Sequence, residues 1–327
     1  MKLKIAAFAI ICLACALVLW PPRAARHDLR ITFIDVGQGD AILVQTPRGH
    51  AFMIDTGGRL ERNESGEGAS AAESVGEKIV VPFLIRQGIH HLDAILLTHP
   101  HGDHVGRVSP ILRTLGADLF FDGEQEYGGR AYRDALNEVR KRHIRTIVPH
   151  AGDVWRTDDG VSLHFLTPPG KYILDPKDQV NENSLVVMLE CVRERKRPYC
   201  VLFMGDAGKI AEGRLLERHA DIHADVLKVG HHGSHFASGA AFLAAVGARD
   251  AVISDGRHNV YHHPAPETLA ALRAAGMRVW RTDLCGAITL SVYGESTSRW
   301  RAAASTAASL NGSGTSVWST QVACASS

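Results

Sequence analysis

The sequence predicts an α+β protein in which helices cover two β-sheets. Its 327 residues are ample for a large hydrophobic core. Three observations predict this class. Strand-sized apolar runs close on Gly, Pro or Asp, amphipathic runs of helical length lie between them, and strands and helices alternate in groups along the chain. Such an order places loops at strand ends, where functional residues usually lie.

Each expected strand is a short run rich in β-branched and aromatic residues, and each expected helix has apolar residues at helical spacing. The run at 266–276 also begins with proline and ends with glycine, as helices often do. Strands are expected at 31–40, 41–49, 51–58, 92–98, 144–149, 161–168, 184–192, 199–207, 224–230, 250–256, 277–283 and 286–294, and helices at 78–89, 107–116, 131–143, 209–219 and 266–276.

The two ends of the chain differ from this body. Residues 1–26 contain two lysines and then an uncharged apolar run, shorter than the ~20 residues of a spanning helix and long for a signal-peptide core. Either a cleaved signal or a membrane anchor is expected, with the protein periplasmic, extracellular or held on the outer face of the cytoplasmic membrane. Residues 27–300 are expected to fold, and the Ala/Ser/Gly-rich residues 301–327 to form a flexible tail. A polar, glycine-rich loop is expected at 59–76.

Charge and cysteine content bear on nucleic-acid binding, on thiolate metal sites and on disulfides. The chain has 36 basic and 35 acidic residues, so its bulk charge does not mark it as a nucleic-acid binder, although a local basic groove stays possible. No C-x-x-C pair lies outside the first segment, which disfavours a thiolate metal site. Cys191 and Cys200 flank a turn between two expected strands. They form a disulfide if the hairpin register pairs them, or are two buried thiols.

The strongest signal is LTHPHGDHVG, directly after the expected buried strand 92–98. Pro100 favours an extended backbone at His99, and residues two apart in extended chain point the same way. His99 and His101 can therefore bind one ion. Gly102 then allows a sharp turn, after which Asp103 and His104 can face a second position. Imidazole and carboxylate groups suit zinc, manganese or iron.

HPHGDH resembles the H-x-H-x-D-H signature of the metallo-β-lactamase superfamily. A wider series occurs in order between 36 and 290: VGQGDAILVQ, MIDTGG, LTHPHGDHVG, NENSLVVML, FMGDA, LKVGHHGS, YHHP and RTDLCGAITL. It resembles the extracellular metallo-hydrolase domain of competence DNA-uptake proteins of the ComEC type, over residues 29–295, and is also similar to teichoic-acid phosphorylcholine esterases. The resemblance implies a four-layer αββα sandwich.

The resemblance also implies a ligand set for two divalent ions, zinc or manganese. His99 and His101 would hold the first ion, Asp103 and His104 the second, and Asp206 in FMGDA would bridge them. One of His231 and His232 would be a further ligand.

Other residues would complete the site. His263 in YHHP would bind metal or hold a phosphate. The segment NENS stands where most members have another histidine, and Asn183 or Ser184 would supply an oxygen to metal or substrate. Asp40 and Asp55 would accept the second N–H of ligand histidines and so fix their tautomer.

As a mechanism, the resemblance implies hydrolysis by a hydroxide that bridges the two metals. Asp103 would orient this nucleophile, and solvent or His263 would protonate the leaving group. The implied substrate is a phosphodiester, with extracytoplasmic DNA first and a wall-polymer or lipid phosphoester second. The alternatives are a lactam, lactone or thioester hydrolase, and a non-catalytic, metal-stabilised and membrane-associated module that docks on a membrane partner through residues 1–26. The glycines of VGQGD predict a tight turn, and no nucleotide cofactor is expected.

Overall fold

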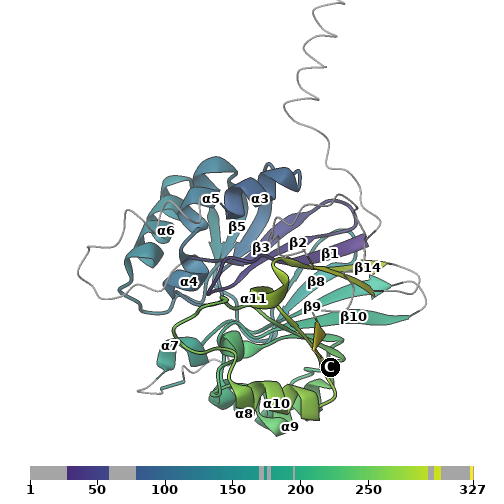
Figure 1. Ribbon diagram of the computed structural model, residues 1–327. Coiled ribbons are helices and arrows are strands. Elements are labelled where there is room, and N and C mark those ends of the chain that lie inside the picture. The colour runs from purple at the N-terminus through teal and green to yellow at the C-terminus, as the bar shows by residue number, and fades with distance from the viewer. Residues whose placement is uncertain are drawn as a thin grey trace, which may run out of the picture.

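The computed structural model describes residues 28–58, 79–168, 173–174, 178–193, 196–293, 298–302 and 325–326. Two eight-stranded sheets lie face to face, and helices cover the outer face of each (Figure 1). The predicted four-layer αββα sandwich is therefore confirmed. The expected N-terminal targeting segment, the loop at 59–76 and most of the tail lie outside the described residues. Within the described part, no helix combines the length and the apolar character needed to cross a bilayer.

The first sheet has the order β15-β14-β1-β2-β3-β4-β5-β6. Its strands are antiparallel from β15 to β3 and parallel from β3 to β6. The bounds are β1 Asp28–Phe33, β2 Ala41–Gln45, β3 Ala51–Thr56, β4 Leu92–Leu96, β5 Ala117–Phe121, β6 Arg145–Ile147, β14 Ile288–Tyr293 and β15 Ser298–Ala302.

The second sheet has the order β16-β13-β12-β11-β10-β9-β8-β7. Strands β10 to β13 are parallel, and the others pair antiparallel with their neighbours. The bounds are β7 Val154–Arg156, β8 Val161–Phe165, β9 Val187–Arg193, β10 Lys196–Phe203, β11 Val226–Lys228, β12 Asp250–Ile253, β13 Arg278–Arg281 and β16 Ala325–Ser326.

Three longer helices pack on the outer face of each sheet, and short helical turns lie in the loops. The outer face of the first sheet packs against α3 Val80–Arg86, α5 Val108–Thr114 and α6 Arg130–Lys141. The second sheet packs against α8 Lys209–Glu217, α9 Ala240–Val246 and α10 Pro266–Ala274. Short helical turns are α4 Gly102–Val105, α7 Gln179–Glu182, α11 Thr282–Cys285 and a 3-10 turn at Gly230–Gly233.

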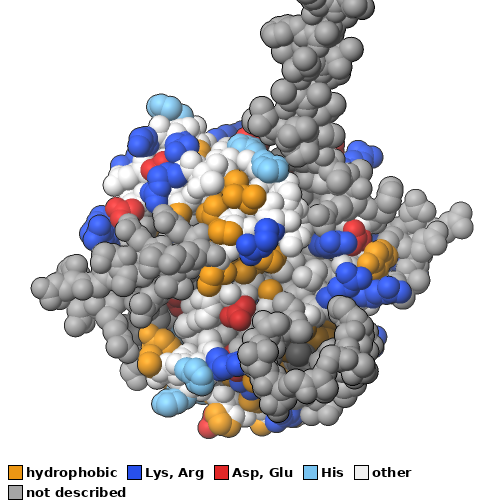
Figure 2. Space-filling model, turned by 45° about the horizontal axis from the view of Figure 1, so that its top comes forward, with side chains coloured by type: hydrophobic (Ala, Val, Ile, Leu, Met, Phe, Trp, Pro, Cys, Tyr) orange, Lys and Arg blue, Asp and Glu red, His pale blue; other side chains and the backbone are white. Residues whose placement is uncertain are grey.

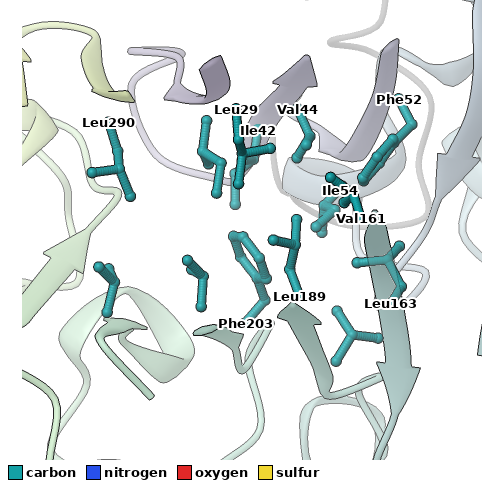
Figure 3. Close-up of a cluster of buried hydrophobic side chains, with 14 of the residues drawn as sticks. Leu29, Ile42, Val44, Phe52, Ile54, Val161, Leu163, Leu189, Phe203 and Leu290 are labelled. Carbon is teal, nitrogen blue, oxygen red and sulfur yellow. The ribbon is translucent and has the colours of Figure 1, made fainter. Parts of the chain in front are cut away.

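The main core lies between the two sheets (Figure 3). Phe33 of the first sheet and Phe203 of the second are fully buried, and their ring centroids lie 6.4 Å apart. Leu29, Phe52 and Leu189 are buried in the same layer. Because burial of one such side chain contributes about 1.5–3 kcal/mol, this layer fixes the sheets against each other. It thereby fixes the loops at their strand ends.

The sequence-based assignment missed several elements of this fold, among them strand β7 Val154–Arg156. Ala117–Phe121 forms a strand because β4 and β6 pair with it on both sides, although its Ala-Asp start has low β-propensity. Ala240–Val246 is a helix whose apolar residues pack on the second sheet. Regular structure was also expected to end with the strand at 286–294, but Ser298–Ala302 adds a further antiparallel strand.

Of the two alternatives for Cys191 and Cys200, the structure has the two thiols and not the disulfide. A register shift in the hairpin places Tyr199 opposite Cys191 and Glu190 opposite Cys200. Residues directly opposite each other on paired strands point to the same face of the sheet, and successive residues point to opposite faces. Cys191, opposite Tyr199, therefore enters the core between the sheets, whereas Cys200 packs toward the outer helices. Both are free thiols, and burial raises the pKa of each to about 11.

We therefore expect both thiols to stay reduced in the folded protein. After unfolding in denaturant without reductant, iodoacetamide should add one group to Cys191 and one to Cys200, as measured by peptide mass spectrometry. A disulfide-linked peptide that contains both residues would contradict this register.

Candidate metal centre

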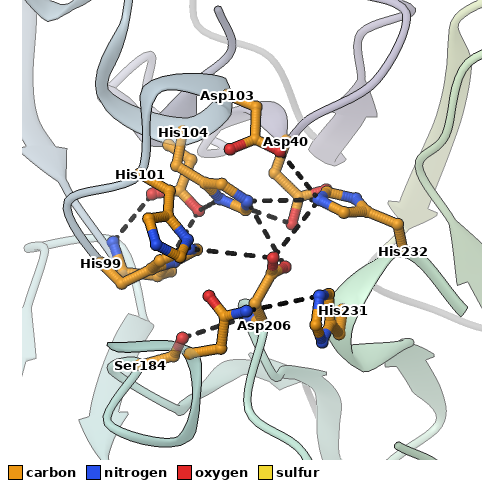
Figure 4. A network of polar contacts seen from close by, with 12 residues as sticks. Asp40, His99, His101, Asp103, His104, Ser184, Asp206, His231 and His232 are labelled. Atoms are coloured by element: carbon orange, nitrogen blue, oxygen red, sulfur yellow. Dashed lines mark hydrogen bonds and ion pairs between the residues drawn. The ribbon is translucent and has the colours of Figure 1, made fainter. Parts of the chain in front are cut away.

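The candidate site lies where the carboxyl ends of strands from both sheets meet. β3 and β4 of the first sheet end at Thr56 and Leu96, and β10, β11 and β12 of the second end at Phe203, Lys228 and Ile253. The loops that follow these ends bring histidine and aspartate side chains into one buried cluster (Figure 4). The packing of the two sheets thus assembles residues that are far apart in the sequence.

The loop after β4 supplies the first pair of imidazoles. His99 Nε2 lies 3.1 Å from His101 Nδ1, so both nitrogens point at one position, as the extended H-P-H spacing predicts. His101 retains an extended backbone (φ −64°, ψ 146°) and precedes the turn of α4. His99 Nε2 is also 3.8 Å from Asp206 Oδ2. Two imidazoles and a carboxylate therefore surround the first position.

A second pair of imidazoles comes from α4 and the Gly230–Gly233 turn. His104 Nε2 lies 3.3 Å from His232 Nε2. Asp103 Oδ2 and Asp206 Oδ2 each lie 3.5 Å from His232 Nε2, and Asp206 Oδ1 lies 3.4 Å from His104 Nε2. The structure thus brings Asp206 between the two imidazole pairs, where a bridging carboxylate was expected.

Ser184 and Gly205 fix the backbone at Asp206. Asp206 N donates a hydrogen bond to Ser184 Oγ (3.2 Å). The preceding Gly205 has φ +54°, and a Cβ at this position would lie 2.9 Å from Thr98 Cβ. Glycine is required there because both the positive φ and the close approach exclude a side chain.

Asn181 faces the first position, although the sequence analysis did not name it. Its Nδ2 lies 3.3 Å from His231 Nε2, and its side chain lies close enough to His101 to raise the pKa of that ring. Its Oδ1 is buried and, within the described part of the chain, has no hydrogen-bond partner. An unsatisfied buried carbonyl oxygen is costly, so this oxygen is suited to bind a ligand.

The predicted oxygen donors Asn183 and Ser184 do not take this place. Asn183 Oδ1 accepts a hydrogen bond from Ile173 N (2.8 Å), and its Nδ2 donates to Ile173 O and Gln179 O. The amide is therefore used to hold the loop. Ser184 is fully buried and accepts the Asp206 N–H, so it positions the backbone and does not reach a substrate.

The structure distinguishes His231 from His232, which the sequence did not. His232 is buried and has its Nε2 in the second imidazole pair, whereas His231 is partly exposed and contacts Asn181 and Asp178. Both have left-handed backbones, with φ +49° and +52°. Adjacent left-handed residues are strained, and here they aim two neighbouring rings in different directions.

Carboxyl and carbonyl oxygens behind the cluster fix the ligand rings. His104 Nδ1 is 2.8 Å from Asp55 Oδ2, and Asp55 also accepts hydrogen bonds from Thr98 N and Thr98 Oγ1. His232 Nδ1 donates to Ser254 O (2.8 Å). With Nδ1 protonated, the Nε2 lone pair of each ring points into the cluster.

Asp40 lies behind both rings but makes its shortest contact elsewhere. Its carboxylate is 4.0 Å from His104 Nδ1 and 3.9 Å from His232 Nδ1, and it accepts a hydrogen bond from the fully buried Lys228 ammonium. Lys228 ends β11 and was not singled out from the sequence, because a lysine within LKVG reads as an ordinary strand-end residue. This ion pair offsets one negative charge beneath the site.

His263 lies outside the cluster. Its ring centroid is 5.7 Å from that of His231, and its backbone is fixed by hydrogen bonds with the Asn259 side chain. Burial and the neighbouring His231 and His232 lower the pKa of His263 to about 4. The ring is therefore neutral at pH 7 and lies beside the site without joining either imidazole pair.

The donor set fits divalent cations. The ligand atoms of His99, His104 and Asp206 lie within 4.8 Å of one another, and so do those of Asp103, His104 and His232. Asp103 Oδ1, like Asn181 Oδ1, is buried without a hydrogen-bond partner among the described residues. Imidazole and carboxylate donors without thiolate suit zinc or manganese. A cation at the first position would be held by His99, His101, Asn181 and Asp206, and one at the second by Asp103, His104, Asp206 and His232.

Charges in the cluster are strongly coupled. Burial alone would raise the pKa of Asp206, but His232 and His104 hold it well below its usual range. Burial alone would lower the pKa of His232, but Asp206, Asp103 and Asp40 raise it to about 10. A proton therefore competes with any cation for His232 Nε2 at neutral pH.

The comparison with protein families agrees with this geometry. The model of the metallo-β-lactamase superfamily matches residues 34–185. The chain carries a metallo-β-lactamase domain. Isothiocyanate hydrolase from Delia radicum gut bacteria has a similar structure, with TM-score 0.51, 14% identity, and coverage of 81% of this chain and 99% of that one. CmlA, a diiron β-hydroxylase from Streptomyces venezuelae, has TM-score 0.51, 12% identity, and coverage of 85% and 54%. These likenesses show the fold.

The metallo-β-lactamase domain is also similar to competence proteins of the ComEC type. It is 34% identical over 275 residues to ComE operon protein 3 of Bacillus subtilis. The match covers 80% of this chain and 34% of that protein. It is 28% identical to competence protein ComA of Neisseria gonorrhoeae, with 86% and 35% covered. The chain spans about a third of the length of these relatives.

We expect cation binding to release protons and to weaken as pH falls. Because the raised pKa of His232 keeps its ring protonated below about pH 10, a cation at the second position must displace that proton. Titration calorimetry with manganese in buffers of different ionisation enthalpy measures the release. The apparent affinity should fall steadily from pH 8 to pH 6. An affinity and heat independent of pH and buffer would contradict this assignment.

The buried Lys228–Asp40 pair gives a stability prediction. Lys228→Met should lower the free energy of unfolding by about 3–5 kcal/mol, because it leaves the Asp40 carboxylate buried without its partner. The double variant Lys228→Met/Asp40→Asn should recover much of this loss in urea denaturation. A double variant as unstable as Lys228→Met alone would contradict the pairing.

Proposed function

We propose that this metallo-β-lactamase domain hydrolyses phosphodiesters at a binuclear site, with extracytoplasmic DNA as its first substrate. The observation that carries the proposal is the pair of cation positions that share Asp206. Two adjacent cations can clamp both the attacking and the leaving oxygen of a phosphoryl group, as in many phosphatases and nucleases.

The residues named above would hold two zinc or manganese ions. When bound, the ions act as Lewis acids that lower the pKa of a water to near 7 and offset negative charge on the scissile group. The protein supplies orientation: Asp55 and Ser254 O fix the rings of His104 and His232 through Nδ1.

Side chains in the cluster and beside it would act on the substrate directly. Asp103 Oδ1 has no hydrogen-bond partner among the described residues and can accept a hydrogen bond from the attacking water, which would orient it. His263, neutral at pH 7, can donate a hydrogen bond from a ring N–H to a phosphoryl or leaving-group oxygen. His231, held by Asn181 and Asp178, lies between His263 and the cluster.

Similarity to competence proteins supports DNA as the substrate, with a wall-polymer or lipid phosphoester as the second candidate. Asn181 in place of a third imidazole gives the first position a weaker nitrogen set, which favours manganese beside zinc. A signal or anchor in residues 1–26 would place the domain outside the cytoplasm, at the membrane surface if it is retained.

The domain loaded with manganese or zinc should hydrolyse bis-p-nitrophenyl phosphate and DNA. Asp206→Ala and His101→Ala should each lower kcat/KM by at least about a hundredfold, because even residues that only support metal ligands cost up to that. Asp153→Asn, at an exposed turn where, among the described residues, the carboxylate faces only His150 and its backbone, is the control and should retain activity. Circular dichroism checks that the variants fold.

Two outcomes would contradict the proposal. Hydrolysis of a β-lactam, a lactone or a thioester without any phosphodiester cleavage would favour the other hydrolase class. Two bound ions per chain with no hydrolysis of any of these substrates would identify a non-catalytic module.

A further inference from the structure

A series of aromatic rings leads from the metal centre to the protein surface. The His232 ring centroid lies 6.4 Å from that of His231, and the His231 centroid lies 5.7 Å from that of His263. The Tyr261 ring follows at 5.8 Å from His263, inclined by 32° to it. Tyr261 is 44% exposed, so the series ends on a ring open to solvent.

Exposed apolar side chains also lie on the segments that carry His263 and His235. Val260 beside Tyr261 is 60% exposed. In the loop after the Gly230–Gly233 turn, the Phe236 ring lies 3.9 Å from the His235 ring and is 56% exposed. His235 also lies close enough to His263 to affect its pKa. Large apolar side chains gathered at the rim of a polar site indicate contact with a ligand.

The loop that carries Tyr261 is held in one conformation. Asn259 Nδ2 donates to Gly256 O (2.9 Å) and to His263 O (2.7 Å), and His263 N donates to Asn259 Oδ1 (2.8 Å). His262 between the two rings has φ +58°, a left-handed conformation that is maintained by these bonds. These bonds therefore fix the backbone on either side of Tyr261 before any ligand arrives.

One lysine supplies positive charge next to the His235–Phe236 pair. The exposed Lys209 ammonium donates to His235 O (2.7 Å), next to the His235–Phe236 pair. Elsewhere, the basic side chains visible among the described residues in Figure 2 are scattered between acidic and hydrophobic ones. A ligand that combines planar apolar groups with negative charge matches this rim better than a lipid chain, which has no planar group.

We propose that Tyr261 forms a stacking subsite for an unpaired nucleobase next to the scissile phosphodiester, so that the preferred substrate is a single-stranded polynucleotide. The inference rests on the proposed phosphodiesterase function. Every base has a π-face, so such stacking tolerates any sequence. The bases of a duplex have their faces covered by their neighbours and cannot reach an isolated tyrosine ring.

The test compares two oligomers with the metal-loaded protein. One is oligothymidylate, and the other has the same length with abasic tetrahydrofuran units in place of the nucleosides. The unaltered protein should cleave oligothymidylate with the higher kcat/KM. Tyr261→Ala should lower the ratio of the two kcat/KM values by about 5- to 100-fold, the range expected when one stacked base loses its aromatic partner. Tyr261→Phe keeps the ring and should keep the ratio.

Val192→Ala is the matched control. Val192 is 66% exposed and lies near the end of β9 away from Ser184, so its loss should leave the ratio unchanged. If neither oligomer is cleaved, the proposed function fails and the subsite with it. If both are cleaved and Tyr261→Ala leaves the ratio unchanged, or if a duplex is cleaved as fast as the single strand, the subsite alone is overturned.

Discussion

The Asp206 carboxylate determines how the site is arranged. Its oxygens lie 3.8, 3.4 and 3.5 Å from ring nitrogens of His99, His104 and His232, which come from two segments far apart in the sequence. A buried carboxylate surrounded by imidazoles must be matched by positive charge, because an uncompensated ion in a protein interior costs several kcal/mol. Protons on the histidines can supply that charge, and so can cations between them. The rest of the site, including the Asp40–Lys228 pair, maintains this balance.

The sandwich makes this concentration of charge possible. The apolar layer between the sheets holds β3 and β4 against β10, β11 and β12, so five loops start from a rigid base. Asp55, His231 and His232 around the cluster have left-handed backbones, and these conformations persist because hydrogen bonds and packing hold them. The packed strands thus stabilise the fold, and the loops at their ends carry the residues of the site.

The sequence predicted much of this molecule, and its failures have physical reasons. The H-x-H-x-D-H cluster was predictable because its geometry is local: extended chain aligns His99 with His101, and Gly102 starts the turn that separates them from Asp103. The choice between His231 and His232 was not, since it depends on two positive φ angles. Asn181 was missed in favour of Asn183 because only the turn of α7 decides which amide faces the metal position.

Long-range pairings were the other limit. Lys228 is recognisable only once Asp40 lies against it, far away in the sequence, and the register of the Cys191 hairpin depends on an irregularity in β10 that no local pattern reveals. Features fixed by neighbours in sequence were therefore predictable, and those fixed by contacts between sheets were not.

The most direct measurement is the metal content of the folded protein after equilibration with excess manganese or zinc and removal of loosely bound ions. Mass spectrometry of the metals should give two ions per chain, and substitution of His101 should remove the ion at the first position while leaving the second. A folded protein that retains no ion, or a single ion that survives replacement of Asp206, would contradict the shared carboxylate on which the account rests.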